Sequence, residues 1–243
     1  MLRHTGQKRS FRHNLRLAVL LCLNAGFINA AGFIAFQVLT TNVTGHAALL
    51  AVDVASAEWR SARMVALWLL LFLAGAFFSG LFISRVGRDR RFAYTLPMVL
   101  IIAIVLFVAV FGHGYDNSLV QKEYFAGSLL FAMGMQNALV SMVSGSVVRT
   151  THLTGMFTDL GIDMSSVLFS NSQQQEFLKR KIILRLTIIS CFLLGGIIGG
   201  LLFRDHGFTA FYIPVGIMII AMFYDYFRIK IARAIQQTTR SRQ

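Results

Sequence analysis

One polar segment of six residues occurs twice in this chain, and its residue types are suited to binding a solute. The copies, Thr-Thr-Asn-Val-Thr-Gly at 40–45 and Thr-Thr-His-Leu-Thr-Gly at 150–155, stand 110 positions apart, and Asp53 and Asp163 follow at the same offset. Threonine hydroxyls and glycine-exposed amides can hold a small polar solute, while a carboxylate can carry a proton or a cation. Membrane proteins built from repeated halves usually bind their substrate where the halves meet. These two Thr-Gly loops therefore indicate a solute site.

Each Thr-Gly loop leads into a stretch that we expect to be a short helix, at about 44–59 in the first copy and 154–170 in the second. Both stretches are shorter than a membrane span, so we expect them to re-enter the membrane or to lie at its surface. The threonine that closes each loop suits an N-cap, and the glycine after it lets the backbone approach a ligand. The free amides of a helix start favour an anion or a carboxylate. The residues concerned are Thr44, Gly45, Thr154 and Gly155.

Three aspartates on these short helices have two interpretations. Asp159 and Asp163 are four residues apart and share a helical face, and Asp53 stands at the place of Asp163 in the first copy. A carboxylate at membrane depth usually marks an ion or proton path, so the three are candidates for coupling movement to protons or cations. If the helices instead run along the membrane interface, the same carboxylates are simply hydrated.

The neighbouring spans contribute further polar candidates. Asn24, Asn29, Gln136 and Asn137 could line the solute path or could instead form hydrogen bonds between helices. His152 stands where the first copy has Asn42, so it is a candidate solute contact or proton carrier. The candidate solute-binding residues are Asn24, Asn29, Thr41, Asn42, Thr44, Gly45, Gln136, Asn137, Thr151, His152, Thr154 and Gly155.

Composition places the chain in a membrane. It has 243 residues, 56% of them hydrophobic, with 22 Phe and only 10 Asp and Glu. A helix needs about 20 apolar residues to cross a hydrocarbon core of ~30 Å. The loops are too short for a separate soluble core, so we expect one all-α transmembrane domain over 1–243. The six expected spans are 15–39, 64–84, 92–112, 124–148, 182–203 and 208–227.

Charge gives the expected orientation. Most of the 23 Lys and Arg lie in the terminal segments 1–14 and 228–243 or in alternate loops, which places both termini in the cytoplasm. The net charge of +13 is then explained by contact with anionic lipid, and no nucleic-acid surface is expected. We expect Arg185 to snorkel toward that face. The basic start and apolar run also resemble a signal peptide, but the run continues beyond residue 30, so we expect it to be kept.

The duplication extends beyond the loops. Gly75 and Gly80 match Gly195 and Gly200 at an offset of 120, and the chain's only prolines, Pro97 and Pro214, take equivalent places. Three spans in each half are an odd number, so the second copy, about 124–227, should be inverted relative to the first, about 15–112. A short re-entrant or interfacial helix would follow the first span of each copy. The spacing of Gly195, Gly196, Gly199 and Gly200 favours close helix packing, within the bundle or between copies in a homo-oligomer.

No signature of an enzyme, a cofactor or a metal site is present. The chain lacks HExxH, a P-loop and a G-x-S-x-G elbow, and its two cysteines fall in separate spans. We therefore expect no catalysis, no cofactor and no bound metal. An intramembrane enzyme stays open only through an unfamiliar constellation, such as Asp159, Asp163 and His152 acting together.

The run Leu-Asn-Ala-Gly-Phe-Ile-Asn-Ala-Ala-Gly at 23–32, followed by Thr-Asn-Val-Thr-Gly and later by Thr-His-Leu-Thr-Gly-Met-Phe-Thr-Asp, resembles the YoaK-like family of bacterial inner-membrane proteins. The similarity covers about 15–227, and the Thr-Gly loops are its most specific part. The resemblance implies a six-span protein of the bacterial inner membrane. It supplies no substrate and no functional residue.

The physical features favour a secondary transporter of a small polar or anionic solute, with proton or cation coupling and alternating access between the two halves. Two other classes stay open. The same symmetry can build a channel, and the glycine faces and basic tail would suit a non-transporting scaffold or lipid-interacting regulator.

Overall fold

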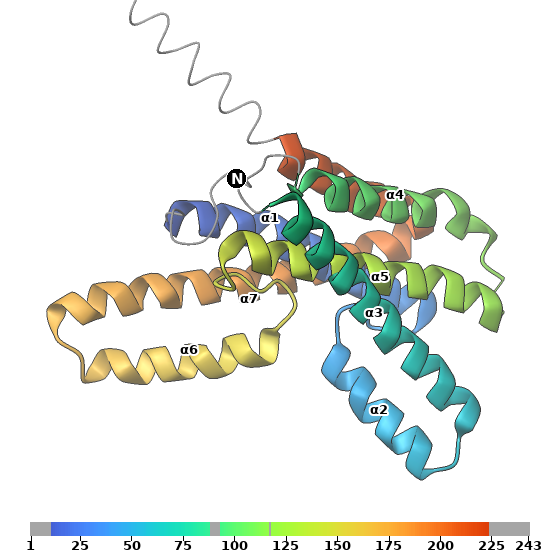
Figure 1. Ribbon diagram of the computed structural model, residues 1–243, viewed down its shortest axis with the longest axis horizontal. Coiled ribbons are helices and arrows are strands. Elements are labelled where there is room, and N and C mark those ends of the chain that lie inside the picture. The colour runs from blue at the N-terminus through green and yellow to red at the C-terminus, as the bar shows by residue number, and fades with distance from the viewer. Residues whose placement is uncertain (1–10, 88–92, 117, 224–243) are drawn as a thin grey trace, which may run out of the picture.

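The computed structural model describes residues 11–87, 93–116 and 118–223, and every regular element among them is helical (Figure 1). The basic termini that carried the orientation prediction lie largely outside these residues, as do the arginines at 88–91. The all-α fold class is confirmed. The helices are α1 Phe11–Phe36, α2 Val43–Ala55, α3 Trp59–Val86, α4 Thr95–Phe111, α5 Leu119–Ser144, α6 Leu153–Leu168 and α7 Ser172–His206, with short 3-10 turns η3 Gly112–Gly114 and η4 Gly207–Phe211.

Five helical stretches are long and apolar enough to cross a membrane. They are Leu15–Phe36, Trp59–Val86, Thr95–Gly114, Leu119–Ser144 and Ser172–Phe223. The last has 52 residues, far more than the 20 or so that one crossing needs. It contains a turn, because Gly207 ends α7 with a φ of 58° and η4 leads into a further helical run at 212–223. The segment 208–227, which we expected to be a sixth span, thus follows this turn, and its described part ends at residue 223.

Two spans end earlier than the apolar pattern predicts. We expected the first to reach residue 39, but α1 stops at Phe36 and Gln37 takes a φ of 56°. We expected the fourth to reach residue 148, but α5 stops at Ser144 because Gly145 adopts a left-handed conformation with φ 63°. The apolar residues that follow each break belong to the loops instead.

Glycines set the closeness of the main helix contacts. A Cβ on Gly26 of α1 would overlap the backbone carbonyl of Phe192 on α7, and one on Gly134 of α5 would overlap that of Phe72 on α3. The same two interfaces are equally close in the other direction. A Cβ on Gly195 of α7 would overlap the Leu23 carbonyl of α1, and one on Gly75 of α3 would overlap the Phe131 carbonyl of α5. The largest helix interfaces, α1 with α7 and α3 with α5, thus form where backbones touch.

The four-glycine face of α7 is occupied within the molecule. Gly195 and Gly199 lie against backbone atoms of Leu23 and Phe27. A Cβ added to Gly196 would lie 3.6 Å from the Gly26 carbonyl, and one added to Gly200 would lie 3.5 Å from the Ile34 side chain. All four neighbours belong to α1. These glycines therefore pack within the bundle, which is the first of the two roles expected for them.

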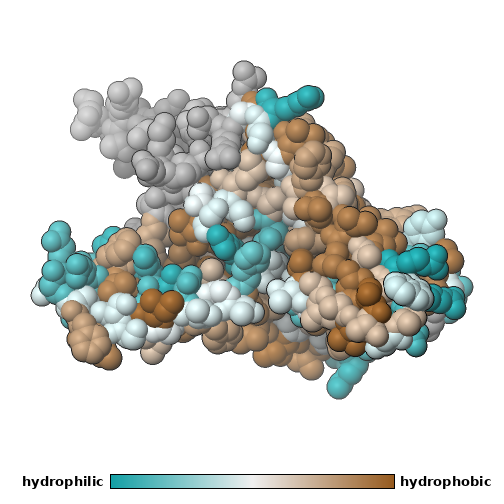
Figure 2. Space-filling view, turned by 60° about the horizontal axis from the view of Figure 1, so that its bottom comes forward, coloured by the Kyte–Doolittle hydropathy of each residue, from teal (hydrophilic) through white to brown (hydrophobic). Residues whose placement is uncertain are grey.

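The surface suits a lipid environment. Leu70, Leu73 and Phe77 of α3 are more than 60% exposed. Few leucines and phenylalanines of a water-soluble protein are exposed to that extent. Figure 2 shows broad apolar areas on one face, with hydrophilic residues in patches near the middle and toward the edges of the view. Together with the five apolar helical stretches, this surface identifies a multi-pass membrane protein.

Candidate functional site: the cavity between the Thr-Gly loops

The two Thr-Gly loops line one cavity of about 390 Å³. In Figure 1 the short helices α2 and α6 start near each other and run outward in different directions, so that both starts face the same space. The residues around the cavity are Asn29, Leu39, Thr41, Asn42, Val43, Thr44, Phe72, Thr151, His152, Leu153, Thr154, Gly155 and Phe192. Segments 110 positions apart in sequence therefore build the two sides of one site.

An asparagine anchors each loop from the preceding span. Asn29 of α1 accepts hydrogen bonds at Oδ1 from the backbone amide of Thr41, at 3.1 Å, and from its Oγ1, at 2.9 Å. Asn137 of α5 accepts one at Oδ1 from Oγ1 of Thr151, at 3.1 Å. Asn29 also lines the cavity, whereas Asn137 does not.

The helix starts differ from the expected ones. The N-cap of α2 is Asn42, whose Oδ1 accepts a 2.9 Å hydrogen bond from the Gly45 amide, and the N-cap of α6 is His152. The expectation that Thr44 and Thr154 cap these helices is wrong, because each helix begins one residue before its threonine. A Cβ on Gly45 would lie 2.5 Å from Nδ2 of Asn42, so this glycine makes room for the cap rather than for a ligand.

The start of α6 is more open than that of α2. His152 makes no side-chain capping bond, and a Cβ on Gly155 would have no neighbour within 4 Å. Leu153, Thr154 and Gly155 all line the cavity. The first-turn amides of α6 lack the side-chain acceptor that Asn42 provides in α2, which leaves this end of the helix available for an acceptor on a solute.

Two of the candidate solute contacts serve helix packing instead. Nδ2 of Asn24 donates a 2.7 Å hydrogen bond to Oε1 of Gln136, and Nε2 of Gln136 donates to the Leu21 carbonyl at 3.0 Å. Both side chains are buried and neither lines the cavity. These hydrogen bonds join α1 to α5, so this pair has the second of its two expected roles, hydrogen bonding between helices.

The histidines have different settings. His152 is exposed beside the cavity, and partial burial, followed by the charge of Arg149, lowers the pKa of its imidazole below the ordinary value. His46 is buried on α2, where Nε2 lies 2.8 Å from the Leu39 carbonyl and the ring meets that of Trp68 edge-on at 5.4 Å. Its Nε2 therefore carries the proton of that hydrogen bond.

None of the three aspartates lines the cavity. Asp53 is half-buried and accepts a 2.6 Å hydrogen bond from Oγ of Ser61, across the turn between α2 and α3. Asp159 and Asp163 both contact Arg185 of α7. Arg185, which we expected to snorkel toward the cytoplasmic face, is thus paired with α6. Any coupling role of the aspartates would act through helix position rather than by direct contact with solute.

Sequence reasoning missed Phe72 and Phe192, which stand 120 positions apart and line the cavity from α3 and α7. The glycine pair at the same offset, Gly75 and Gly195, was the signal that could have found them. Among the described residues no group of three His, Cys, Asp or Glu is placed to hold a metal ion.

Comparison with known proteins places these features in a family. Over 210 residues the chain is 26% identical to the UPF0700 transmembrane protein YoaK of Bacillus subtilis strain 168, an alignment that covers 84% of this chain and 92% of that protein. No solved structure matches the chain. Residues 17–224 match the family described as Protein of unknown function (DUF1275). The resemblance carried by the Thr-Gly loops is thus confirmed, and the chain belongs to the DUF1275 family, with YoaK among its relatives.

Proposed function

We propose that this protein is a secondary transporter of a small polar or anionic solute. The observation that carries the proposal is the cavity of about 390 Å³ that both Thr-Gly loops line. Its volume is in the range of small-molecule sites, about 300–1,000 Å³. A site built from both halves of one chain is the arrangement on which alternating access depends.

The two halves are proposed to be inverted repeats of three spans, each with a short helix after its first span. The contact of Gly26 with Phe192 has its counterpart in that of Gly134 with Phe72, with the roles of the halves exchanged. The hydrogen bond between Asn29 and Thr41 has a counterpart between Asn137 and Thr151. These paired contacts support a pseudo-twofold axis that passes near the cavity.

The lining supports the class of solute. It contains threonine hydroxyls, Asn29, Asn42 and the starts of two helices, and the described residues contribute no carboxylate to it. Helix starts concentrate partial positive charge, so an acidic or strongly polar group is favoured between them. Phe72 and Phe192 supply the apolar walls.

Transport would follow from rocking of one half against the other, with the cavity opening to each side of the membrane in turn. Proton or cation coupling through Asp53, Asp159 or Asp163 belongs to this proposal. We place both termini in the cytoplasm of a bacterial inner membrane, where basic segments meet anionic lipid. The matched lining favours the transporter over a scaffold, which would need no cavity.

Binding is tested first, on purified protein in detergent. A panel of small carboxylates and phosphate, beside uncharged polyols of similar size, should contain a compound that raises the melting temperature. Thr44→Val and Thr154→Val should abolish that shift. Thr158→Val is the matched control, because Thr158 is exposed on α6, lies outside the cavity, and donates its hydroxyl hydrogen bond to the Thr154 carbonyl.

Transport is then tested in proteoliposomes loaded with the unlabelled hit. A transporter drives uphill uptake of the labelled compound by counterflow, which a channel cannot do. Equal binding by the Thr154→Val and Thr158→Val variants, or uptake that never exceeds equilibrium, would reject the proposal.

A further inference from the structure

Helix α6 is attached to the rest of the molecule by a narrow stripe of side chains. Its buried residues are Met156, Leu160 and Asp163, which recur at helical spacing. Its principal packing partner is α7. Four large apolar residues of α6 are more than half exposed: Phe157, Ile162, Met164 and Leu168. The position of α6 therefore depends on few contacts, and one of them is charged.

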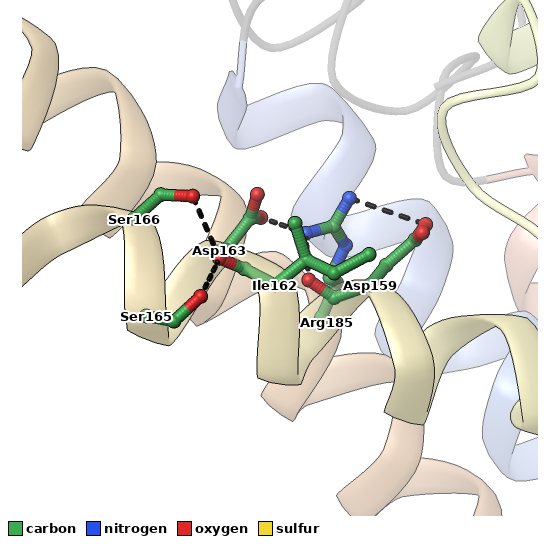
Figure 3. Close-up of polar contacts among 6 residues, drawn as sticks. All are labelled: Asp159, Ile162, Asp163, Ser165, Ser166 and Arg185. Carbon is green, nitrogen blue, oxygen red and sulfur yellow. Dashed lines mark hydrogen bonds and ion pairs between the residues drawn. The ribbon is translucent and has the colours of Figure 1, made fainter.

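Arg185 of α7 makes that charged contact at two levels of α6 (Figure 3). Its Nη2 lies 3.2 Å from Oδ2 of Asp159, and its Nη1 donates a 2.7 Å hydrogen bond to the Asp159 carbonyl. Nη1 also pairs with Oδ2 of Asp163. The Arg185 side chain is 17% exposed and that of Asp163 8%, so water screens this pair poorly. A planar guanidinium with several fixed donors holds its partners in a defined geometry, which a single ammonium does not.

The first half holds its short helix differently. Asp53, which aligns with Asp163, bonds to the Ser61 hydroxyl and joins no ion pair among the described residues. In place of a charge, His46 fixes α2 by its contacts with the Leu39 carbonyl and the Trp68 ring. The attachment of α2 is thus neutral and aromatic, while that of α6 is ionic.

The ionic contact lies close to the cavity along the helix. Asp159 comes one turn after Gly155, and α6 starts directly at the second Thr-Gly loop. A shift of α6 along or away from α7 therefore moves Thr154 and Gly155 with it. The first loop, attached to α2, does not share this dependence.

We propose that Arg185 is a positioning residue for the cavity: by pairing with Asp159 and Asp163 it holds α6, and with it the second Thr-Gly loop, in place. This makes α6 the half-helix whose position is set by charge pairing. The role in transport rests on the proposed function, whereas the placement of the loop does not.

The placement is tested by thiol labelling in a Cys22→Ala, Cys191→Ala background. Thr154→Cys reports on the second loop and Thr44→Cys on the first. Adding Arg185→Gln should change the rate at which a hydrophilic maleimide modifies the second loop several-fold, and should leave the first unchanged. Arg180→Gln is the matched control, because its pair with Glu176 on the same helix is exposed, at 60% and 65%, and holds no other helix. An unchanged rate, or an equal change at both loops, would overturn the proposal.

A second variant protects the test against misfolding. Exchanging the charges, Asp163→Arg with Arg185→Asp, should bring the labelling rate part of the way back if pairing positions the loop, because the ion pair re-forms while Asp159 then faces a carboxylate. Arg185→Lys keeps the charge without the fork and should restore it only in part. A double exchange that folds, by gel filtration, but labels like Arg185→Gln would also reject the proposal. Labelling needs no solute, so the labelling test can reject the role of Arg185 while solute binding to the cavity is still observed. Solute binding can likewise be absent while the labelling test succeeds.

Discussion

Asn137 on α5 holds Thr151 through a 3.1 Å hydrogen bond and yet does not line the cavity, although Asn29, its counterpart on α1, does. The two asparagines thus accept the same kind of hydrogen bond from a loop threonine, one at the cavity wall and the other away from it. In each case the amide oxygen accepts, so an aspartate could take over the hydrogen bond and add a negative charge.

This difference predicts unequal effects of one substitution. Asn29→Asp should keep the loop bonded but place a carboxylate in the cavity wall, which repels an anionic solute. Asn137→Asp should weaken binding much less, because Asn137 does not line the cavity. The measurement is the concentration of the active compound that gives half of the maximal thermal shift. Similar losses in the two variants would argue against an anionic solute, and so would no loss in either.

The N-cap of α2 offers a second matched comparison. Asn42 caps α2 at the cavity, and Asn171 caps α7 at an exposed turn through a 3.0 Å hydrogen bond from the Gln174 amide. Substitution of either by alanine should reduce the free energy of unfolding by about 1 kcal/mol. Only Asn42→Ala should also weaken solute binding, because only Asn42 lines the cavity. Thermal melts with and without the active compound separate the two effects.

The helix contacts predict where small residues are required. Gly75→Ala would place a methyl group against the Phe131 carbonyl and should destabilise the protein by about 1–3 kcal/mol. Gly80→Ala, on the same helix, would meet only Met142 Sδ at 4.0 Å and should be neutral or slightly stabilising. Melting temperatures in detergent compare them directly. A Gly80→Ala variant as unstable as Gly75→Ala would contradict the assigned contact between α3 and α5.

Sequence predicted the parts of this site that repeat and missed those that pair across the molecule. The Thr-Gly loops were recognisable because duplication leaves a mark in the chain itself. The contacts of Asn24 with Gln136 and of Asp163 with Arg185 left none, since each depends on how two distant helices cross. Phe72 and Phe192 were hidden for another reason, because a phenylalanine in a span reads the same whether it faces lipid or a cavity.

The exposed imidazole of His152 predicts a pH effect with a definite sign. Because its pKa is lowered in the folded protein, the unfolded chain binds the proton more tightly. Folding stability from this group is therefore complete above the ordinary pKa of about 6.5 and is lost as the pH falls from there to the lowered pKa of the folded state. His152→Gln should reduce the drop in melting temperature between pH 8 and pH 5.5. His206→Gln, at the end of α7 and outside the cavity, is the control. A drop unchanged by His152→Gln would show that other groups carry it.

The two aligned aspartates should respond differently to neutralisation. Asp53→Asn keeps an oxygen that can accept the Ser61 hydroxyl, so it should cost little stability. Asp163→Asn leaves the guanidinium of Arg185 with a weaker partner in a shielded place, where removing one member of an ion pair costs about 3–5 kcal/mol. The loss should fall at or below the lower end of that range, because Asp159 still contacts the arginine.

Urea unfolding measures stability, and flux of the active compound against a pH gradient measures coupling in the same variants. If Asp53→Asn folds normally and also loses the pH-driven component, coupling runs through the first half. If only Asp163→Asn loses it, the proton or cation acts on the ionic attachment of α6, and the asymmetry between the two short helices has a functional consequence.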